Sequence, residues 1–193
     1  MKVRIIGVGG AAVRILDKMI MARDLPGGIF AAVDSDPYLP ANSLSEIQIH
    51  LDMRVPGFYN GGNPKIGEQK ALEKEESIRK ELGGTRCGIL VTALGGGIGT
   101  GASPVIARIL KKSGAKVAAV ATLPYDFEGG KRMRIAMEGM NALARIVDVL
   151  MIHRNEIKDP ELRRHLRLPD AWRMSDDAVS LMVKKADSGL SRE

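Results

Sequence analysis

Short apolar runs alternate with helical patterns along almost the whole 193-residue chain. The apolar runs cover residues 2–8, 29–33, 46–51, 88–93, 116–123 and 147–152, and the third of them is the weakest. Between them the apolar residues recur at helical spacing. Continuous apolar strands that alternate with helices are typical of a parallel sheet covered on both faces. The sequence therefore predicts a three-layer, Rossmann-like α/β domain with a mainly parallel sheet and helices on both faces.

Glycine and proline residues indicate where the intervening helices begin and end. We expect one helix over residues 66–82, ended by the pair 83–84, and another that opens at Pro104 and ends at Gly114. A polar loop rich in Gly, Asn and Pro is predicted for residues 54–65. After Lys158 we expect two further helices, a short one and a second from about Ser175.

Composition and charge narrow the classes of function. The formal charge is +6, but Lys and Arg are interspersed with acids and aromatic residues make up only 4%, so the stacking platforms of single-strand binders are scarce. No apolar stretch approaches the roughly 18–20 residues that span a bilayer. The single cysteine, Cys87, excludes an intramolecular disulfide framework. We predict a cytoplasmic protein and predict neither a DNA nor a membrane partner.

The first candidate site follows the first apolar run, where Gly9, Gly10 and Ala11 open a helix. Glycines at such a turn let the backbone approach a phosphate, and the helix N-terminus supplies free N–H groups. Residues 7–12 also match the pattern of dinucleotide sites, in which Asp34 would hold a ribose. A tight turn without a ligand is the third interpretation. Asp34 and Asp36 could position a water or Mg²⁺ near phosphates, or serve as turn caps.

The second candidate site is a glycine run between an apolar strand and a helix. Five glycines in seven positions cost conformational entropy and are not needed for an ordinary turn. They are understandable if successive backbone N–H groups face a polyphosphate, with Thr100 as an additional hydroxyl donor. The run consists of Gly95, Gly96, Gly97, Ile98, Gly99, Thr100 and Gly101.

These segments resemble the tubulin/FtsZ family. Residues 94–107 resemble its signature loop, most closely that of FtsZ. Residues 61–67 resemble the family's loop beside the γ-phosphate, and residues 127–133 resemble its F-E-G-x-x-R-M segment. Residues 152–156 take the place of its I-P-N-D, and residues 172–177 resemble the start of its central helix. The motifs occur in the family's order from Val3 to about Val183.

The resemblance implies a tubulin/FtsZ GTPase-domain fold with a site for GTP or GDP. Asp176 would accept hydrogen bonds from guanine N1–H and the 2-amino group, which selects guanine over adenine. Trp172 would pack on the base or be an ordinary core residue, Glu128 and Arg132 would contact the nucleotide, and Asn155 would contact the sugar or base. The remaining implied nucleotide-binding residues are Gly9, Gly10, Ala11, Asp36, Gly62, Asn63, Gly95, Gly96, Gly97, Ile98, Gly99, Thr100 and Gly101.

The sequence departs from the family pattern in three places. Residues 11–14 replace further Gly and Asn residues; among them Arg14 could add charge near the phosphates or be a solvated helix residue. Ile98 replaces a Thr or Ser, and a lost hydrogen bond to a charged partner is worth roughly 1.5–3 kcal/mol, so γ-phosphate or Mg²⁺ coordination would be weakened. Nothing here corresponds to the family's acidic catalytic loop and second domain. The end could be a natural terminus or a trimmed chain.

We therefore expect residues 1–174 to form a GTP- or GDP-binding domain, with residues 175–193 as a central-helix remnant and polar C-terminus of the same domain. The predicted function is an FtsZ-like cytoskeletal or assembly module that is inactive or very slow in GTP hydrolysis alone and has no catalytic residues of its own. Its expected partners are a guanine nucleotide, Mg²⁺ as a candidate companion, and a second copy or a full-length FtsZ-like protein across the nucleotide face. The alternatives are a GTPase activated in trans, an NAD-binding module, and an interaction domain that has lost nucleotide binding, which Ile98 and Arg14 would support. No metal site is predicted, because the histidines lack ligand spacing.

Overall fold

The computed structural model describes residues 3–51 and 62–190 and contains one six-stranded sheet. The strand order is β3-β2-β1-β4-β5-β6, and every neighbouring pair is parallel. This confirms the predicted fold class, and each strand lies within two residues of its predicted bounds. The strands are β1 (Arg4–Val8), β2 (Ile29–Asp34), β3 (Ile47–His50), β4 (Cys87–Ala93), β5 (Lys116–Leu123) and β6 (Val149–Arg154).

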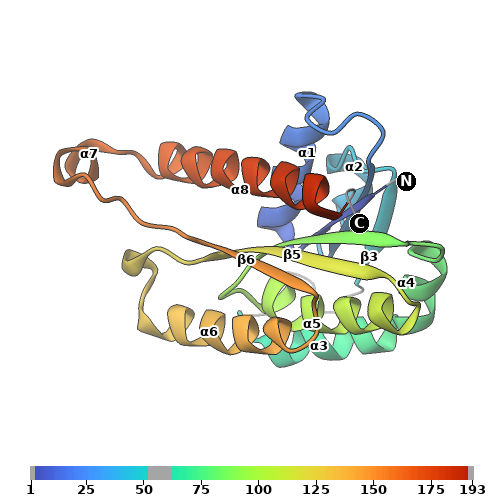
Figure 1. The fold of residues 1–193 in the computed structure, drawn as a ribbon. Coiled ribbons are helices and arrows are strands. Elements are labelled where there is room, and N and C mark those ends of the chain that lie inside the picture. Colours follow the sequence, from blue (N-terminus) through green and yellow to red (C-terminus); the bar gives the residue numbers. More distant parts are fainter. Residues whose placement is uncertain (1–2, 52–61, 191–193) are drawn as a thin grey trace.

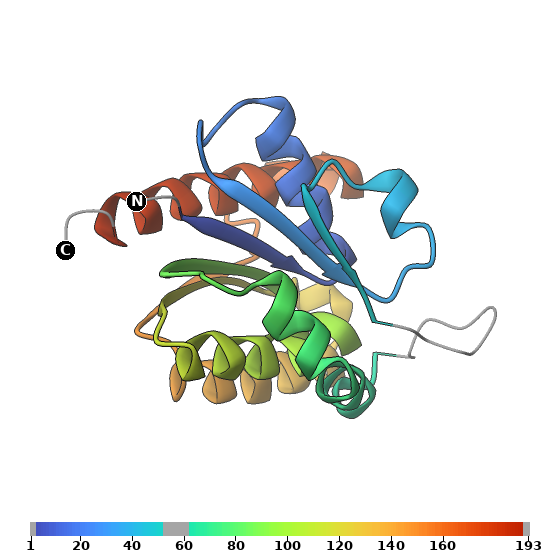
Figure 2. The ribbon, with the colours of Figure 1, turned by 90° about the vertical axis from the view of Figure 1, so that its right-hand side faces the viewer.

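Helices cover both faces of the sheet (Figures 1 and 2). One face carries α1, α2 and α8, and the other carries α3, α4, α5 and α6. The short α7 projects away from the body at the left of Figure 1. The helices are α1 (Gly10–Met21), α2 (Leu39–Asn42), α3 (Pro64–Glu73), α4 (Glu75–Glu81), α5 (Gly97–Lys112), the 3₁₀ turn η1 (Asp126–Glu128), α6 (Gly130–Ala144), α7 (Pro160–His165) and α8 (Leu168–Leu190).

Each face of the sheet has its own hydrophobic core. Ile5 of β1 points into a core shared with Leu16 of α1 and Val183 of α8, whereas its neighbour Ile6 points into the opposite core with Ile106 of α5. The side chains of Ile5, Ile6, Leu16 and Ile106 are all fully buried. Because successive strand residues face opposite sides, a strand that is buried on both faces must be largely apolar, as the central strands β1, β4 and β5 are.

Three helix predictions were wrong at their boundaries. The predicted helix over 66–82 is broken at Lys74 into α3 and α4. Pro104 does not open α5 but lies inside it, because the helix already begins at Gly97 within the glycine run. The last helix begins at Leu168 and not near Ser175. In α5 the contacts described below outweigh the poor helix propensity of glycine.

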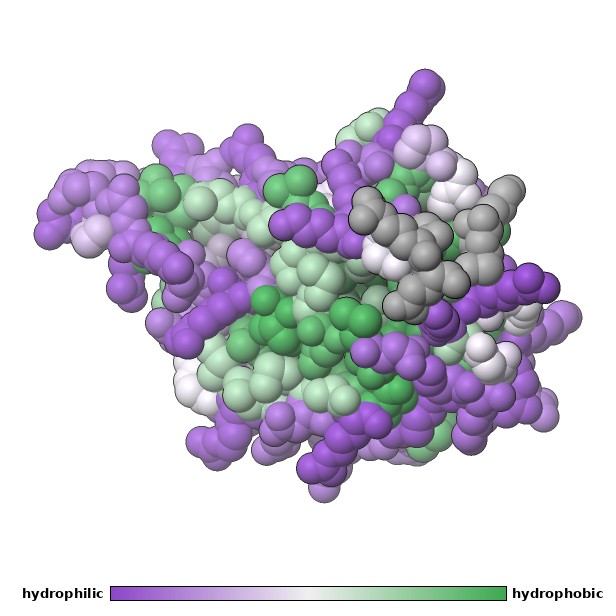
Figure 3. Space-filling model, in the orientation of Figure 1, coloured by the Kyte–Doolittle hydropathy of each residue, from purple (hydrophilic) through white to green (hydrophobic). Residues whose placement is uncertain are grey.

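The edge strand β6 is less covered than the central strands. Its residues are half-buried or exposed, and Val149 retains 46% of its accessible surface. Figure 3 shows apolar side chains gathered in the middle of this side of the molecule, surrounded by hydrophilic ones.

Within residues 3–51 and 62–190, no helix is both long and apolar enough to cross a membrane.

Candidate functional site

Two glycine turns meet beyond the carboxyl ends of the two central strands. Gly9 follows β1 with φ +88°, and a Cβ placed on it would lie 3.0 Å from the amide nitrogen of Gly99 in the first turn of α5. Its own N–H donates to the carbonyl of Val33 at 2.8 Å, which fixes the turn against β2. The first N–H groups of a helix have no partner inside it. The contact therefore brings the N-termini of α1 and α5 to one place.

The glycines of the second turn serve different purposes. Gly95 has φ +100°, and a Cβ there would meet Arg132 at 2.8 Å. A Cβ on Gly99 would lie 2.5 Å from the carbonyl of Ala93, so the return from β4 into α5 requires glycine. Gly96, the N-cap of α5, has a negative φ, and a Cβ added to it would meet no atom of the described residues within 4 Å. Gly96 is therefore the position where open space remains above the helix end.

Two further glycines let α3 and α5 touch through their backbones. A Cβ on Gly101 would lie 1.9 Å from the carbonyl oxygen of Pro64, and one on Gly67 would lie 2.3 Å from that of Gly97. Sequence reasoning attributed the whole glycine run to phosphate binding. For Gly101 and Gly99 the described packing alone requires glycine, so the run is in part structural.

The side chains at the start of α5 are turned inward. The hydroxyl of Thr100 accepts the N–H of Gly95 at 2.8 Å, and the residue is only 4% exposed. Ile98 is 7% exposed and belongs to the core between α3 and the sheet. Its side chain thus fills core volume on the side away from solvent. Sequence reasoning missed Thr92, whose hydroxyl donates to the carbonyl of Gly99 at 3.0 Å and fastens α5 to β4.

The start of α3 lies beside this turn. Asn63 is the N-cap, and its side-chain oxygen accepts the N–H of Lys65 at 3.1 Å. Gly62 before it has φ +72°. The contact between Pro64 and Gly101 places this cap next to α5. Gly61 and most of the predicted loop over residues 54–65 lie outside the described residues.

The segment after β5 supplies a second pair of predicted residues. Glu128 accepts the N–H of Tyr125 at 2.8 Å, and its other oxygen lies 3.2 Å from Nε of Arg132. Arg132 in turn lies against Gly95. The two predicted residues are therefore joined to each other and to the turn that opens α5.

Tyr125 ties the same segment to α8. Its ring stacks on Phe127 at 5.0 Å, and its hydroxyl donates to the carbonyl of Ala171 at 2.7 Å. Burial raises the pKa of the Tyr125 phenol, and the carboxylates of Glu128 and Asp176 act in the same direction. The phenol thus remains a hydrogen-bond donor. This tyrosine was not predicted, although a buried Tyr next to the F-E-G segment needs a partner for its hydroxyl.

The first turns of α8 carry the residues predicted to meet the base. Asn155, just beyond β6, accepts a hydrogen bond from the hydroxyl of Ser175 at 2.7 Å. Trp172 is 47% exposed, so it is not an ordinary core residue. Asp176, one residue after Ser175, is 2% exposed. Asn155 and Asp176 therefore lie at the same end of α8.

Asp176 already has a cationic partner. The guanidinium of Arg14, from the second turn of α1, donates to its Oδ2. Lys18, one turn further along α1, lies 3.6 Å from the same oxygen and 3.1 Å from Asp177. Arg14 is therefore not a purely solvated helix residue, because its guanidinium forms an ion pair with Asp176. It pairs with the carboxylate predicted to recognise guanine.

The two aspartates after β2 have local partners. Asp34 accepts the N–H of Ser35 at 2.8 Å, and Asp36 caps the next turn by accepting the N–H of Tyr38 at 2.8 Å. Burial raises the pKa of Asp34, Asp36 raises it further, and the Ser35 N–H and His50 oppose the shift. A Cβ on Gly10 would lie 3.2 Å from Oδ2 of Asp34, so this carboxyl borders the first turn of α1.

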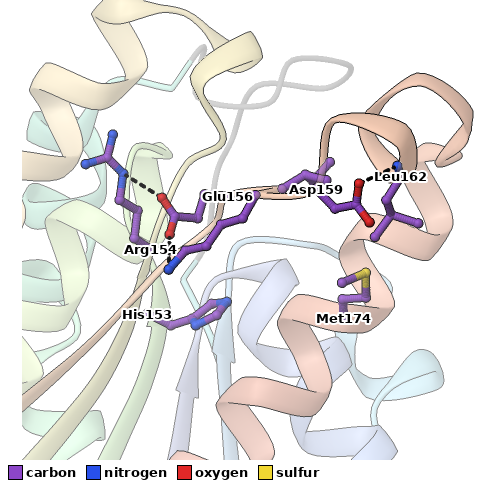
Figure 4. A pocket seen from close by; sticks show the side chains of 8 residues that line it. His153, Arg154, Glu156, Asp159, Leu162 and Met174 are labelled. Atoms are coloured by element: carbon purple, nitrogen blue, oxygen red, sulfur yellow. Dashed lines mark hydrogen bonds and ion pairs between the residues drawn. The ribbon is translucent and has the colours of Figure 1, made fainter.

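A separate pocket of about 530 Å³ lies between the segment after β6 and the start of α8 (Figure 4). Figure 4 shows Glu156 beside Arg154, and the two carboxylate oxygens of Glu156 lie 4.0 Å from Nε of Arg154 and 3.0 Å from Nζ of Lys158. Burial lowers the pKa of His153, although Glu156 opposes the shift. None of the predicted nucleotide-binding residues lines this pocket. Its lining residues are His153, Arg154, Glu156, Ile157, Lys158, Asp159, Leu162 and Met174.

Comparison with known proteins identifies the family. The model of the "Tubulin/FtsZ family, GTPase domain" matches residues 2–157. The chain belongs to the tubulin/FtsZ family. Cell division protein FtsZ from Pseudomonas putida is 36% identical over 191 residues, which cover 98% of this chain and 48% of that protein. Cell division protein FtsZ 1 from Thermococcus kodakarensis is 34% identical over 188 residues, covering 95% of this chain and 49% of that protein.

Solved structures of the family agree with this fold. An empty FtsZ dimer from M. jannaschii has a TM-score of 0.85 at 33% identity and covers 95% of this chain and 53% of that chain. CetZ2 from Haloferax volcanii, solved as a GTPγS-bound protofilament, has a TM-score of 0.78 at 21% identity over 95% of this chain and 57% of that chain, which shows the fold alone. The tubulin/FtsZ chain described here spans about half the length of the curated relatives that it matches.

Proposed function

We propose that the chain binds a guanine nucleotide, GDP or GTP, beyond the carboxyl ends of β1, β4, β5 and β6. The observation that carries the proposal is the contact of Gly9 with Gly99, which joins the N-termini of two helices. Partial positive charge and unpaired N–H groups at helix N-termini suit a polyphosphate. The open space above Gly96 leaves room for a phosphate group to approach that backbone.

The remaining predicted residues suit the other parts of a nucleotide. Arg132, half-exposed beside Gly95, is a candidate for contacts with phosphate or ribose oxygens. Asp176 and Asn155 at the start of α8 are candidates for the base and the sugar, and the exposed ring of Trp172 offers a flat apolar face to a base. Family membership favours this mononucleotide over the NAD interpretation of residues 7–12.

We further propose that the chain acts as a binding and assembly module and hydrolyses GTP negligibly by itself. Each carboxylate that the described loops contribute to the site has a structural partner already. Asp34 and Asp36 accept backbone N–H groups, Glu128 holds Arg132, and Asp176 holds Arg14. A general base needs a carboxylate directed at the attacking water.

Mg²⁺ is proposed as a companion of the phosphates, because oxygen ligands from Asp34 or Asp36 and from phosphate suit this ion.

Self-association across the nucleotide face is part of the same proposal. The M. jannaschii relative is described as a dimer and the H. volcanii relative as a protofilament. We expect sedimentation velocity to detect species larger than the monomer when GTP is present. A monomer at every concentration, with and without nucleotide, would contradict this part of the proposal.

Calorimetric titration of nucleotide-stripped protein tests nucleotide binding. We expect GDP and GTP to bind and ADP and NAD to bind more weakly, each measured with and without Mg²⁺. Gly96→Ala should lower the affinity for GDP by about tenfold or more, because its Cβ would enter the space proposed for a phosphate and each 1.4 kcal/mol is tenfold. Gly189→Ala is the matched control, since its Cβ also meets no atom of the described residues within 4 Å but lies near the C-terminal end of α8. Absence of binding to all four nucleotides would overturn the proposed function.

The engagement of every described carboxylate at the site favours a second candidate, in which a partner supplies the acid for hydrolysis. The test is phosphate release by this chain mixed with a full-length FtsZ relative. Turnover above the sum of the two separate proteins, lost again with Gly96→Ala, would support activation in trans. Additive turnover would exclude it.

A further inference from the structure

The partner of Asp176 has the same hydrogen-bonding edge as the proposed ligand. An Arg guanidinium presents N–H groups in a planar fork that matches a carboxylate. Guanine presents N1–H and its 2-amino group in a similar planar fork. Because Asp176 is 2% exposed and Arg14 donates to its Oδ2, the carboxylate is covered by the chain's own guanidinium. A base that is to bind Asp176 through this edge must first displace Arg14.

We infer that Arg14 is a specificity-determining residue of the nucleotide site, which competes with guanine for Asp176 and so weakens the preference of this chain for guanine over adenine. The inference rests on the proposed function. Adenine has no N1–H and no 2-amino group, so it gains nothing from a free Asp176. The competition therefore lowers the affinity for guanine nucleotides selectively, because the apparent affinity is proportional to the fraction of time that Asp176 is free of Arg14.

The geometry allows Arg14 to leave Asp176. Its side chain is 49% exposed, so the guanidinium can turn into solvent without breaking a core. Lys18 lies 3.6 Å from the same oxygen and would still face the carboxylate, and Asp177 lies 3.1 Å from Lys18. Further along the same pair of helices, Ser180 and Lys184 of α8 both contact Asp24 beyond α1. The contact between α1 and α8 is thus held at several points, and the loss of one ion pair does not separate the helices.

The ratio of the dissociation constants for ADP and GDP is the decisive measurement. We expect Arg14→Ala to raise this ratio by about tenfold, as for a carboxylate that Arg14 occupies about nine-tenths of the time. IDP, which has N1–H but no 2-amino group, should gain less than GDP. Arg14→Lys should change the ratio less than Arg14→Ala, because an ammonium retains the charge but lacks the planar fork. The ratio cancels any uniform effect of the lost charge on the phosphates.

Two further variants separate this competition from other roles of Arg14. In the Asp176→Ala background, Arg14→Ala should leave the ADP-to-GDP ratio unchanged, because the contested carboxylate is gone. Arg145→Ala removes one charge at the C-terminal end of α6 and should also leave the ratio unchanged. Circular dichroism checks that each variant is folded.

The possible outcomes distinguish the inference from the proposed function. If wild-type protein binds GDP but Arg14→Ala leaves the ratio unchanged or lowers it, the inference is wrong and the nucleotide site stands. An equal rise in the Asp176→Ala background would also overturn the inference, since Arg14 would then act elsewhere. If neither wild-type protein nor Arg14→Ala binds any nucleotide, both proposals fail. If only Arg14→Ala binds, the proposed function of the wild-type chain fails, whereas the competition between Arg14 and guanine is supported in its strongest form.

Discussion

Gly101 of α5 lies so close to the carbonyl oxygen of Pro64 that an added Cβ would be 1.9 Å from it. Real Cβ atoms do not approach backbone oxygens to this distance, so α3 and α5 would have to separate. We expect Gly101→Ala to lower the free energy of unfolding by about 1–3 kcal/mol, the usual cost of overpacking. Urea denaturation monitored by circular dichroism measures this change.

The control for this prediction is Gly96→Ala. Its Cβ would meet nothing within 4 Å among residues 3–51 and 62–190, and its φ is −97°, so we expect a loss of about 1 kcal/mol or less, mainly through the N-cap. Gly101→Ala should therefore mainly lower the free energy of unfolding, whereas Gly96→Ala should mainly lower the affinity for nucleotide. Equal destabilisation by both would contradict the packing role of Gly101.

Ile98 occupies the position where the family resemblance implies a hydroxyl residue, but its side chain is in the core. We expect Ile98→Thr to lower the free energy of unfolding by about 1–3 kcal/mol, because it buries a hydroxyl in apolar surroundings. GDP affinity should not rise. Ile98→Val is the control and should cost about 0.5–1.5 kcal/mol. A clear gain in GDP affinity with Ile98→Thr would show that the side chain can reach the nucleotide.

The hydrogen bond from Tyr125 to Ala171 can be tested with the chain's single tryptophan. We expect Tyr125→Phe to cost about 1–3 kcal/mol of stability, because the buried carbonyl of Ala171 loses its donor. Trp172 is the next residue, so its emission should shift and iodide should quench it more strongly if the start of α8 loosens. Tyr38→Phe is the control, because Tyr38 is 69% exposed. Identical quenching in both variants would argue against an anchor at Ala171.

The raised pKa of Asp34 predicts a pH dependence of stability. Burial raises the folded-state pKa above the ordinary value of 3.8, so between these two values the folded protein holds a proton that the unfolded chain has lost. Stability therefore falls as the pH rises through this window. Asp34→Asn cannot ionise, and we expect its stability relative to wild type to be greater at pH 7 than at pH 4. Urea titrations at both values measure this, and an equal difference at the two pH values would contradict the prediction.

The sequence predicts the central strands of the sheet well because they are buried on both faces. Residues 116–123, for example, are apolar almost throughout, and β5 has these bounds. The glycine turns could be located for a related reason, since such runs are rare outside sites of close backbone approach. Their individual purposes could not be predicted, because the neighbour of Gly101 is Pro64, and only the folded chain brings these two residues together.

The pairing of Arg14 with Asp176 also lies beyond sequence reasoning. The residues are 162 positions apart, and neither belongs to a pattern that names the other. Trp172 is the converse case: its exposure decides between the two interpretations that the sequence left open, and excludes the one in which it fills a core. Its packing on a base stays a prediction.

Strand β1 lies between β2 and β4 in the sheet, and β4 comes much later in the sequence than β2. Arg4 pairs with Ile29 on one side and with Gly88 on the other. A ribosome makes the chain from the N-terminus, so β1, β2 and β3 emerge before β4 can complete the centre of the sheet. Gly9 is synthesised before this interval, whereas Gly99 follows β4 and is synthesised after it. A growing chain therefore lacks the proposed nucleotide site until most of it has been synthesised, and a nucleotide bound there would stabilise only a fold that already includes β4 and the start of α5.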